Sequence, residues 1–269
     1  DADADAMEWQ LTDSVSFALY APTIPLLSIY RGRLVTNGNP IYIAGGGLDL
    51  DFSTNRYFNF ANSRIYCGYG NFRVLNPATA TIVSTNSTIT VNTGVFQGGG
   101  KVYHNVNAAS GPSSFSISNG DSFNNILLSA TTVNFTSILG GTGMTAKKIT
   151  SNTPSLDFNT PLAVIDSMIL NGATSTIRTS NKYNKSFSVK EGTTLRLGAK
   201  EVQWFQNTCN VDLIGTPALQ IQFFCVTTGD TAYLRKDSAS VCADFINMRD
   251  IWGVGNGVNP AGCTSFGNA

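Results

Sequence analysis

Short runs in which apolar and polar residues alternate cover most of this 269-residue chain. From Leu26 onward the runs are three to six residues long, and two to five turn-forming residues such as Asn37-Gly38 separate them. Alternation places successive side chains on opposite faces, as in a strand with one buried face. Apolar spacing of three and four residues is not sustained, so helices are not expected.

The same arrangement recurs along the chain, most clearly over Thr93–Leu128. The best internal match pairs N-S-T-I-T-V-N-T-G (86–94) with A-T-S-T-I-R-T-S-N (173–181). Such short strands suit a solenoid coil of about 20 to 25 residues better than a sandwich, whose strands are longer. The pattern therefore predicts a stack of short β coils, with the regular repeats ending near Gly198.

The amino-acid composition limits the kinds of ligand and reaction that this chain is expected to support. Charged residues make up 13% of the chain and the formal net charge is +0, so no electrostatic footprint for nucleic acid is expected. The 42% of hydrophobic residues are spread in alternation, unlike a disordered tail. His104 is the one histidine, which argues against His-based zinc sites and against most hydrolase constellations. A catalytic role for His104 is not expected, nor is a cofactor.

One pair of carboxylates is a candidate ligand or cation face. Asp49 and Asp51 alternate on L-D-L-D-F, so they point to the same side of one strand, about 7 Å apart. That separation suits a cation or an acid–base pair. Alternation alone predicts a polar outer face opposite Leu48, Leu50 and Phe52, and this is the preferred interpretation.

Glycine, aromatic and asparagine residues give weaker signals. Gly45–Gly47 and Gly98–Gly100 are not followed by the Lys-Ser/Thr of a phosphate loop, so they are interpreted as tight corners. Several aromatic residues form either a sugar-stacking platform or part of the core: Tyr57, Phe58, Phe60, Tyr66 and Tyr69. Turn asparagines are expected to stack as ladders inside the coil: Asn92, Asn105 and Asn125.

Five cysteines leave at least one unpaired if the others bridge within the chain. Cys242 and Cys263 flank a Gly/Asn-rich loop, and by analogy with other secreted, loop-rich chain ends we expect a disulfide to close it. Cys67 and Cys225 sit in strand-like runs and are equally well explained as small buried residues. The state of Cys209 stays open.

Four phrases in order carry a resemblance to a known family: G-R-L-V-T-N-G-N, F-Q-G-G-G-K-V-Y-H-N-V, S-F-N-N-I-L-L and L-N-G-A-T-S-T-I, at Gly32–Asn39, Phe96–Val106, Ser122–Leu128 and Leu170–Ile177. They resemble the repeat-rich surface proteins of Bacteroidota that are cargo of the type IX secretion system, including gliding-motility adhesins. The resemblance covers most of Leu26–Phe266. The sorting domain that normally ends such proteins is not visible, so export is inferred for a longer parent protein.

The resemblance implies a right-handed parallel β-helix, a location at the outer face of a bacterial outer membrane, and adhesive or stalk-like roles. It implies two kinds of partner, the secretion or motility machinery of that membrane and extracellular polysaccharide. It also suggests O-glycosylation where Asp-Ser/Thr precedes a small or aliphatic residue, at Ser14, Ser167, Thr231 and Ser238. No stretch is apolar enough for a transmembrane segment.

We therefore expect an all-β, right-handed parallel β-helix with a less regular C-terminal cap. The expected divisions are an N-terminal cap segment over 1–25, β-helix repeats over 26–200, and C-terminal rungs with a cap over 201–269. The expected function is that of a non-catalytic segment of a cell-surface adhesin or structural stalk. The alternative is a polysaccharide-active β-helix enzyme, a lyase or hydrolase, which needs clustered carboxylates with Lys or Arg on one face.

Overall fold

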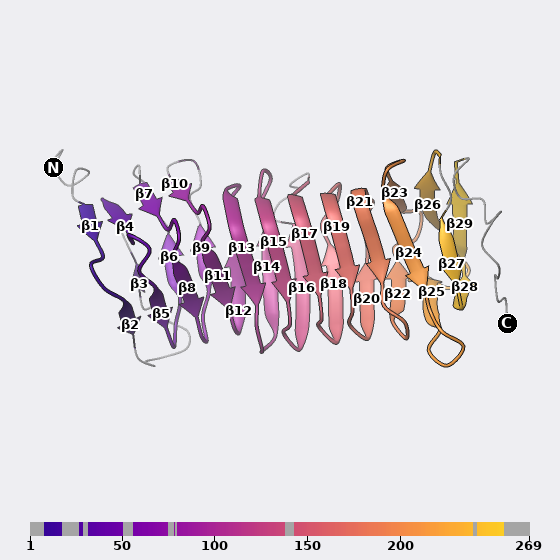
Figure 1. Ribbon diagram of the computed structural model, residues 1–269, viewed down its shortest axis with the longest axis horizontal. Helices are drawn as coiled ribbons and strands as arrows, with labels where there is room; N and C mark the ends of the chain where they lie inside the picture. Colours follow the sequence, from indigo (N-terminus) through magenta and orange to yellow (C-terminus); the bar gives the residue numbers. More distant parts are fainter. Residues whose placement is uncertain are drawn as a thin grey trace.

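The computed structural model describes residues 8–17, 27–28, 32–50, 56–74, 78, 80–137, 143–238 and 241–255. Within these ranges the chain is all-β, and every strand pairing is parallel. The strands stack as a β-solenoid along the long axis of the molecule (Figure 1). The expectation of a parallel β-helix is thus confirmed.

In the part of the chain that the structure describes, three sheets form the sides of the solenoid. Sheet A has four strands: β1 (Glu8–Gln10), β4 (Arg33–Val35), β7 (Arg56–Asn59) and β10 (Ala80–Val83). Sheet B has fourteen strands: β2 (Val15–Phe17), β5 (Ile41–Ile43), β8 (Arg64–Cys67), β11 (Thr88–Val91), β13 (Val102–Ala108), β15 (Ser122–Leu128), β17 (Thr145–Ser151), β19 (Val164–Leu170), β21 (Asn181–Val189), β23 (Val202–Phe205), β24 (Asn210–Ile214), β26 (Ala232–Lys236), β27 (Cys242–Asp244) and β29 (Ile251–Val254).

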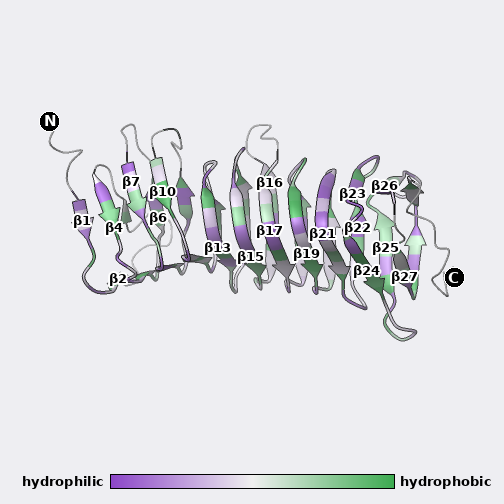
Figure 2. Cartoon of the chain, turned by 45° about the horizontal axis from the view of Figure 1, so that its top comes forward, coloured by the Kyte–Doolittle hydropathy of each residue, from purple (hydrophilic) through white to green (hydrophobic). Residues whose placement is uncertain are grey.

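Sheet C has eleven strands: β3 (Leu27–Ser28), β6 (Leu48–Leu50), β9 (Phe72–Val74), β12 (Gly94–Gln97), β14 (Ser113–Ile117), β16 (Thr132–Ser137), β18 (Ser155–Asn159), β20 (Thr174–Ile177), β22 (Thr194–Leu197), β25 (Ile221–Cys225) and β28 (Ile246–Arg249). Apolar and polar residues alternate along many strands (Figure 2). The apolar positions point inward and form one continuous core.

A column of phenylalanine rings runs through that core beside sheet C. Phe72 stacks on Phe96 with ring centroids 5.4 Å apart. The column continues in register through Phe115, Phe135 and Phe158, with centroid distances of 5.5, 4.5 and 5.0 Å. All five rings are buried, and such pairs add about 0.5–1.5 kcal/mol each to the gain from burial alone.

The N-terminal coils have three sides because a tight turn separates sheet A from sheet B. Asn37, Asn62 and Asn86 occupy this turn with φ of 52°, 61° and 53°, a left-handed conformation that asparagine tolerates. Asn86 Nδ2 donates a hydrogen bond to Asn62 Oδ1 at 3.2 Å, so the turns also contact one another. Ile41, Ile65 and Ile89 stack in register, which gives these coils a repeat of 24 residues.

In the described coils that follow Asn86 this turn has no counterpart, and the coil becomes shorter. The next inward residue in the column, Val106, follows Ile89 by only 17 residues. One seven-residue strand, β13, replaces a sheet A strand, a turn and a sheet B strand. Among the described residues, sheet A therefore ends at β10, and the solenoid narrows from three sides to two.

Parallel pairing continues past Gly198 as far as β29, although less regularly. Strand β21 pairs with both β23 and β24, and Leu197 pairs with Cys225, which lies 28 residues further along. These longer coils form the less regular C-terminal end. The described part of the chain contains no helix with the length and hydrophobicity needed to cross a bilayer.

Candidate functional site

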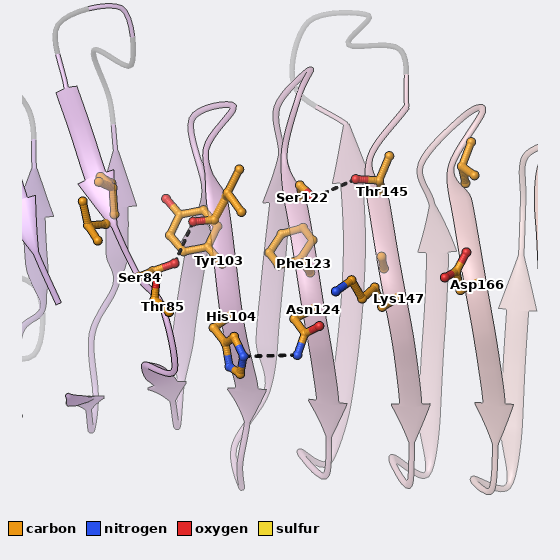
Figure 3. A pocket seen from close by; sticks show the side chains of 15 residues that line it. Ser84, Thr85, Tyr103, His104, Ser122, Phe123, Asn124, Thr145, Lys147 and Asp166 are labelled. Carbon is orange, nitrogen blue, oxygen red and sulfur yellow. Dashed lines mark hydrogen bonds between the residues drawn. The ribbon is translucent and has the colours of Figure 1, made fainter. Parts of the chain in front are cut away.

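A groove of about 650 Å³ opens where the solenoid narrows. Residues 82–85 of the last three-sided coil form one wall, and the outer sides of β13, β15, β17 and β19 form the floor (Figure 3). Ser84 Oγ donates a hydrogen bond to the backbone oxygen of Val102 at 2.8 Å, which ties the wall to the floor. The groove therefore crosses four successive coils.

A bend in each long strand shapes the floor. In β13 the inward residues are Tyr103 and Val106, three positions apart instead of two. Two consecutive residues, His104 and Asn105, consequently face outward at the bend. Strands β15, β17 and β19 repeat the pattern, so the bends form a double row of outward side chains.

We call the first of these rows the corner row; it contains His104, Asn124, Lys147, Asp166 and Asn184. Figure 3 shows its first four members in a line across successive strands. Asn184 Nδ2 donates a hydrogen bond to Asp166 Oδ1 at 3.0 Å. The corner row therefore presents amide, imidazole, ammonium and carboxylate groups within a short distance of one another.

Asparagine stacking occurs in the second row. Asn125 Nδ2 donates a hydrogen bond to Asn105 Oδ1 at 2.9 Å. The expected ladder is confirmed for this pair, but both side chains are half-buried on the outer side of the strand, not inside the coil. Asn92 lies elsewhere, where it accepts a hydrogen bond from Ser110 Oγ.

The two ring nitrogens of His104 have different surroundings. Its Nε2 lies 3.4 Å from Asn124 Nδ2, a long hydrogen bond in which the amide is the donor if that nitrogen is unprotonated. Its Nδ1 is buried and has no hydrogen-bond partner in the described part of the chain. The imidazole is thus half-buried at the end of the corner row.

Asp166 is the carboxylate of the groove lining. Lys185 Nζ lies 2.7 Å from its Oδ2. Hydrogen bonds from Lys185 and Asn184 lower the pKa of Asp166, so this side chain stays ionised well below neutral pH. Asp166 is suited to act as a fixed negative charge, whereas a proton donor at neutral pH would need a raised pKa.

The buried carboxylate of Asp121 stabilises the chain corner that directly precedes β13. It accepts hydrogen bonds from the backbone N–H groups of Gly100, Lys101 and Ser118 at 2.8, 3.1 and 2.8 Å. Burial raises the pKa of Asp121 to about 6, although these three donors lower it in part. Gly98–Gly100 therefore forms a tight corner, as predicted, and Gly99 and Gly100 adopt φ of 65° and 72°.

The predicted cation face is described only in part, because Asp51 lies outside the described residues. Asp49 is 7% exposed and forms an ion pair with Arg73 of the next coil, whose Nε lies 2.8 Å from Asp49 Oδ1. A guanidinium thus already contacts this carboxylate. In the described part of the chain, no group of three or more His, Cys, Asp or Glu side chains is placed to hold a metal ion.

Of the five aromatic residues considered as a sugar-stacking platform, some lie in the core and others at the surface. Phe58 and Phe60 are fully buried and stack at 5.9 Å, so they belong to the core. Arg33 covers the Tyr57 ring, with its guanidinium carbon 4.4 Å from the ring centroid. Tyr69 is exposed and Tyr66 half-exposed, so a single platform of five rings does not form.

Three cysteines are buried free thiols: Cys67, Cys209 and Cys225. Burial raises the pKa of Cys67 to about 12, so its thiol stays protonated. The predicted Cys242–Cys263 disulfide falls outside the described part, which contains neither Cys263 nor the Cys242 side chain. It remains a prediction.

The candidate glycosylation sites differ in exposure. Ser14 and Ser238 are exposed, whereas Ser167 and Thr231 are half-buried. Ser167 lies in the second row of the bend, next to Asp166. Modification at any of the four remains a prediction.

Sequence reasoning did not recognise the groove. Asn124, Lys147 and Lys185 attract no attention as separate residues, and Asp166 stands out only as part of a glycosylation signal. The missed signal is the three-residue spacing of inward apolar residues inside otherwise alternating strands, as in Tyr103 and Val106. Comparison of the chain with protein-family models, curated proteins and solved structures finds no match, so the site is interpreted from its own residues.

Proposed function

We propose that this chain is a non-catalytic segment of a secreted cell-surface adhesin or structural stalk that binds polysaccharide through the outer rows of its solenoid. In this proposal the parent protein is exported by the type IX secretion system, acts in gliding motility and contacts the secretion or motility machinery. The four sequence phrases that resemble such proteins support this setting. The stacked coils support it too, because a solenoid supplies an extended binding surface.

The groove across four coils is the observation that carries the proposal. It is long and open, and the corner row and its neighbours line it with hydroxyl, amide and charged groups. Such groups exchange hydrogen bonds with sugar hydroxyls. Glycoside hydrolysis usually uses two carboxylates, whereas Asp166, with a lowered pKa, is the one carboxylate among the described residues that line the groove. This arrangement favours binding over turnover.

Affinity gel electrophoresis on a panel of polysaccharides tests the proposal. Ser122 faces the groove, so Ser122→Trp should fill it and abolish the retardation of the purified chain. Ser116→Trp is the matched control, because it adds the same bulk on the outer side of sheet C. Equal retardation of both variants, or no retardation of the unmodified chain by any polysaccharide, would contradict the proposal.

The alternative is a polysaccharide lyase or hydrolase. The observation in its favour is that His104, Lys147 and Asp166 line one groove. Incubation with the same panel, followed by detection of new reducing ends or unsaturated sugars, decides between the two. Turnover that is lost in His104→Ala or Asp166→Asn would overturn the non-catalytic proposal.

A further inference from the structure

Positive charge is concentrated on the floor of the groove and just beyond it. Lys147 and Lys148 face outward on β17, and Lys182 and Lys185 face outward on β21. The strand between them, β19, contributes one carboxylate, Asp166. We call these four lysines the lysine patch. The whole chain has a formal net charge of +0, so the patch is a local asymmetry.

Two of the lysines have partners and two do not. Lys185 pairs with Asp166, and Lys182 Nζ lies 4.9 Å from the centroid of the Trp204 ring. Lys147 and Lys148 are exposed, and neither forms an ion pair within the described part of the chain. Lys147 is near enough to help lower the pKa of Asp166. Its ammonium group is therefore available to a ligand in the groove.

We infer that the groove and the lysine patch bind an acidic polysaccharide whose carboxylate groups contact Lys147, Lys148 and Lys182. This inference rests on the proposed function and names the class of polysaccharide. The ammonium groups supply charge-assisted hydrogen bonds to the carboxylates. Ser122, Asn124 and Thr145, on the floor of the same groove, supply hydrogen bonds to sugar hydroxyls.

The spacing of the coils suits a polymer of this kind. Neighbouring strands lie about 4.8 Å apart, so Lys147 on β17 and Lys182 on β21 are separated along the solenoid axis by two strand spacings, about 10 Å. Along the strand direction they are offset by two residue positions. Val164 on β19 lies in register between Thr145 and Lys182. A chain lying along the solenoid axis would thus pass the lysines of β17 and then those of β21.

A carboxylated sugar polymer fits the patch better than a nucleic acid does. Proteins that bind single-stranded nucleic acid stack bases on exposed aromatic rings, whereas Tyr103 and Phe123, the rings in the described lining of the groove, are buried.

Affinity electrophoresis of the intact chain in gels containing polygalacturonate provides the test. The same gels are run with carboxyl-reduced polygalacturonate, which is neutral, and with single-stranded DNA. Lys147→Gln/Lys148→Gln/Lys182→Gln should bind polygalacturonate about tenfold more weakly, as expected for three exposed ion pairs. Lys190→Gln/Arg196→Gln/Lys200→Gln, with changes on β22 and in the turns beside it, is the matched control and should bind normally.

The outcomes separate the inference from the proposed function. Binding of polygalacturonate that weakens with added salt and is about tenfold weaker in the patch variant supports the inference. Equal binding of the neutral polymer, or unchanged binding by the patch variant, overturns it and leaves polysaccharide binding intact. Tighter binding of DNA than of polygalacturonate also overturns it. Failure to bind any polysaccharide overturns both.

Discussion

Asp121 shows how one buried group links this fold to pH. Its pKa is about 6 in the folded chain and near 3.8 when exposed, so the folded state holds the proton more tightly. Stability from this group is therefore complete below about pH 4 and is lost as the pH rises through about 6. The shift corresponds to about 3 kcal/mol between these limits.

Asp121→Asn removes the titration but keeps the shape of the protonated carboxyl group. We expect its free energy of unfolding to be nearly constant between pH 4 and pH 7, while that of the unmodified chain falls with rising pH. Urea unfolding at several pH values measures both. Parallel pH profiles for the two proteins would show that another group is responsible.

Gly70 illustrates a second requirement at the residue scale, the close approach of neighbouring coils. A Cβ atom at Gly70 would lie 0.7 Å from the carbonyl oxygen of Gly46, which is backbone and cannot move aside. We expect Gly70→Ala to cost more than about 3 kcal/mol of stability, in the range of the most damaging core changes.

Gly38→Ala is the matched control for this effect. A Cβ at Gly38 would meet nothing within 4 Å, although its φ of 81° strains any other residue. The expected loss is about 1 kcal/mol, from backbone strain alone. Thermal or urea unfolding compares the two variants, and equal losses would mean that crowding between coils is unimportant.

At the scale of single elements, the phenylalanine column holds the two-sided coils together. The Phe115 ring lies between those of Phe96 and Phe135. We expect Phe115→Ala to cost about 3–5 kcal/mol and Phe115→Leu clearly less, because leucine leaves a smaller cavity. Urea unfolding provides the measurement. Losses of similar size for the two variants would indicate that the cavity does not determine the effect.

The alternation of apolar and polar residues predicts most of the strands. In a regular coil each inward residue packs against its counterpart in the neighbouring coil, so the pattern within a short segment is enough to identify a strand. The column Phe72, Phe96, Phe115 follows directly from it. The bends at His104 and Asn124 break the alternation, and their register depends on contacts with neighbouring coils. The groove could not be predicted for the same reason, since it arises where one turn disappears and sheet A ends.

At the scale of the whole molecule, the solenoid has a step after Asn86, where three-sided coils give way to two-sided coils. Sheets B and C continue across it, but β10 does not pair with β13. Nearest-neighbour contacts dominate the stability of a solenoid, so we expect coupling between coils to be weakest at this point.

Hydrogen exchange measured by mass spectrometry tests this expectation. Phe158→Ala should speed exchange in β16–β20 strongly and in β4–β10 very little. Phe58→Ala is the reciprocal variant and should affect β4–β10 most. Faster exchange spreading evenly across the step in both variants would show that the solenoid behaves as one cooperative unit.

The parallel pairing of the strands also determines how the molecule responds to tension. Every strand lies across the long axis, so the backbone hydrogen bonds between coils point along it (Figure 1). A pull between the two ends loads these bonds one row at a time, as in peeling, instead of shearing many rows together. A 24-residue coil that detaches would release about 8 nm of extended chain. A solenoid held at its two ends would therefore lengthen in steps as single coils detach. It would absorb a sudden pull while its remaining coils stay folded.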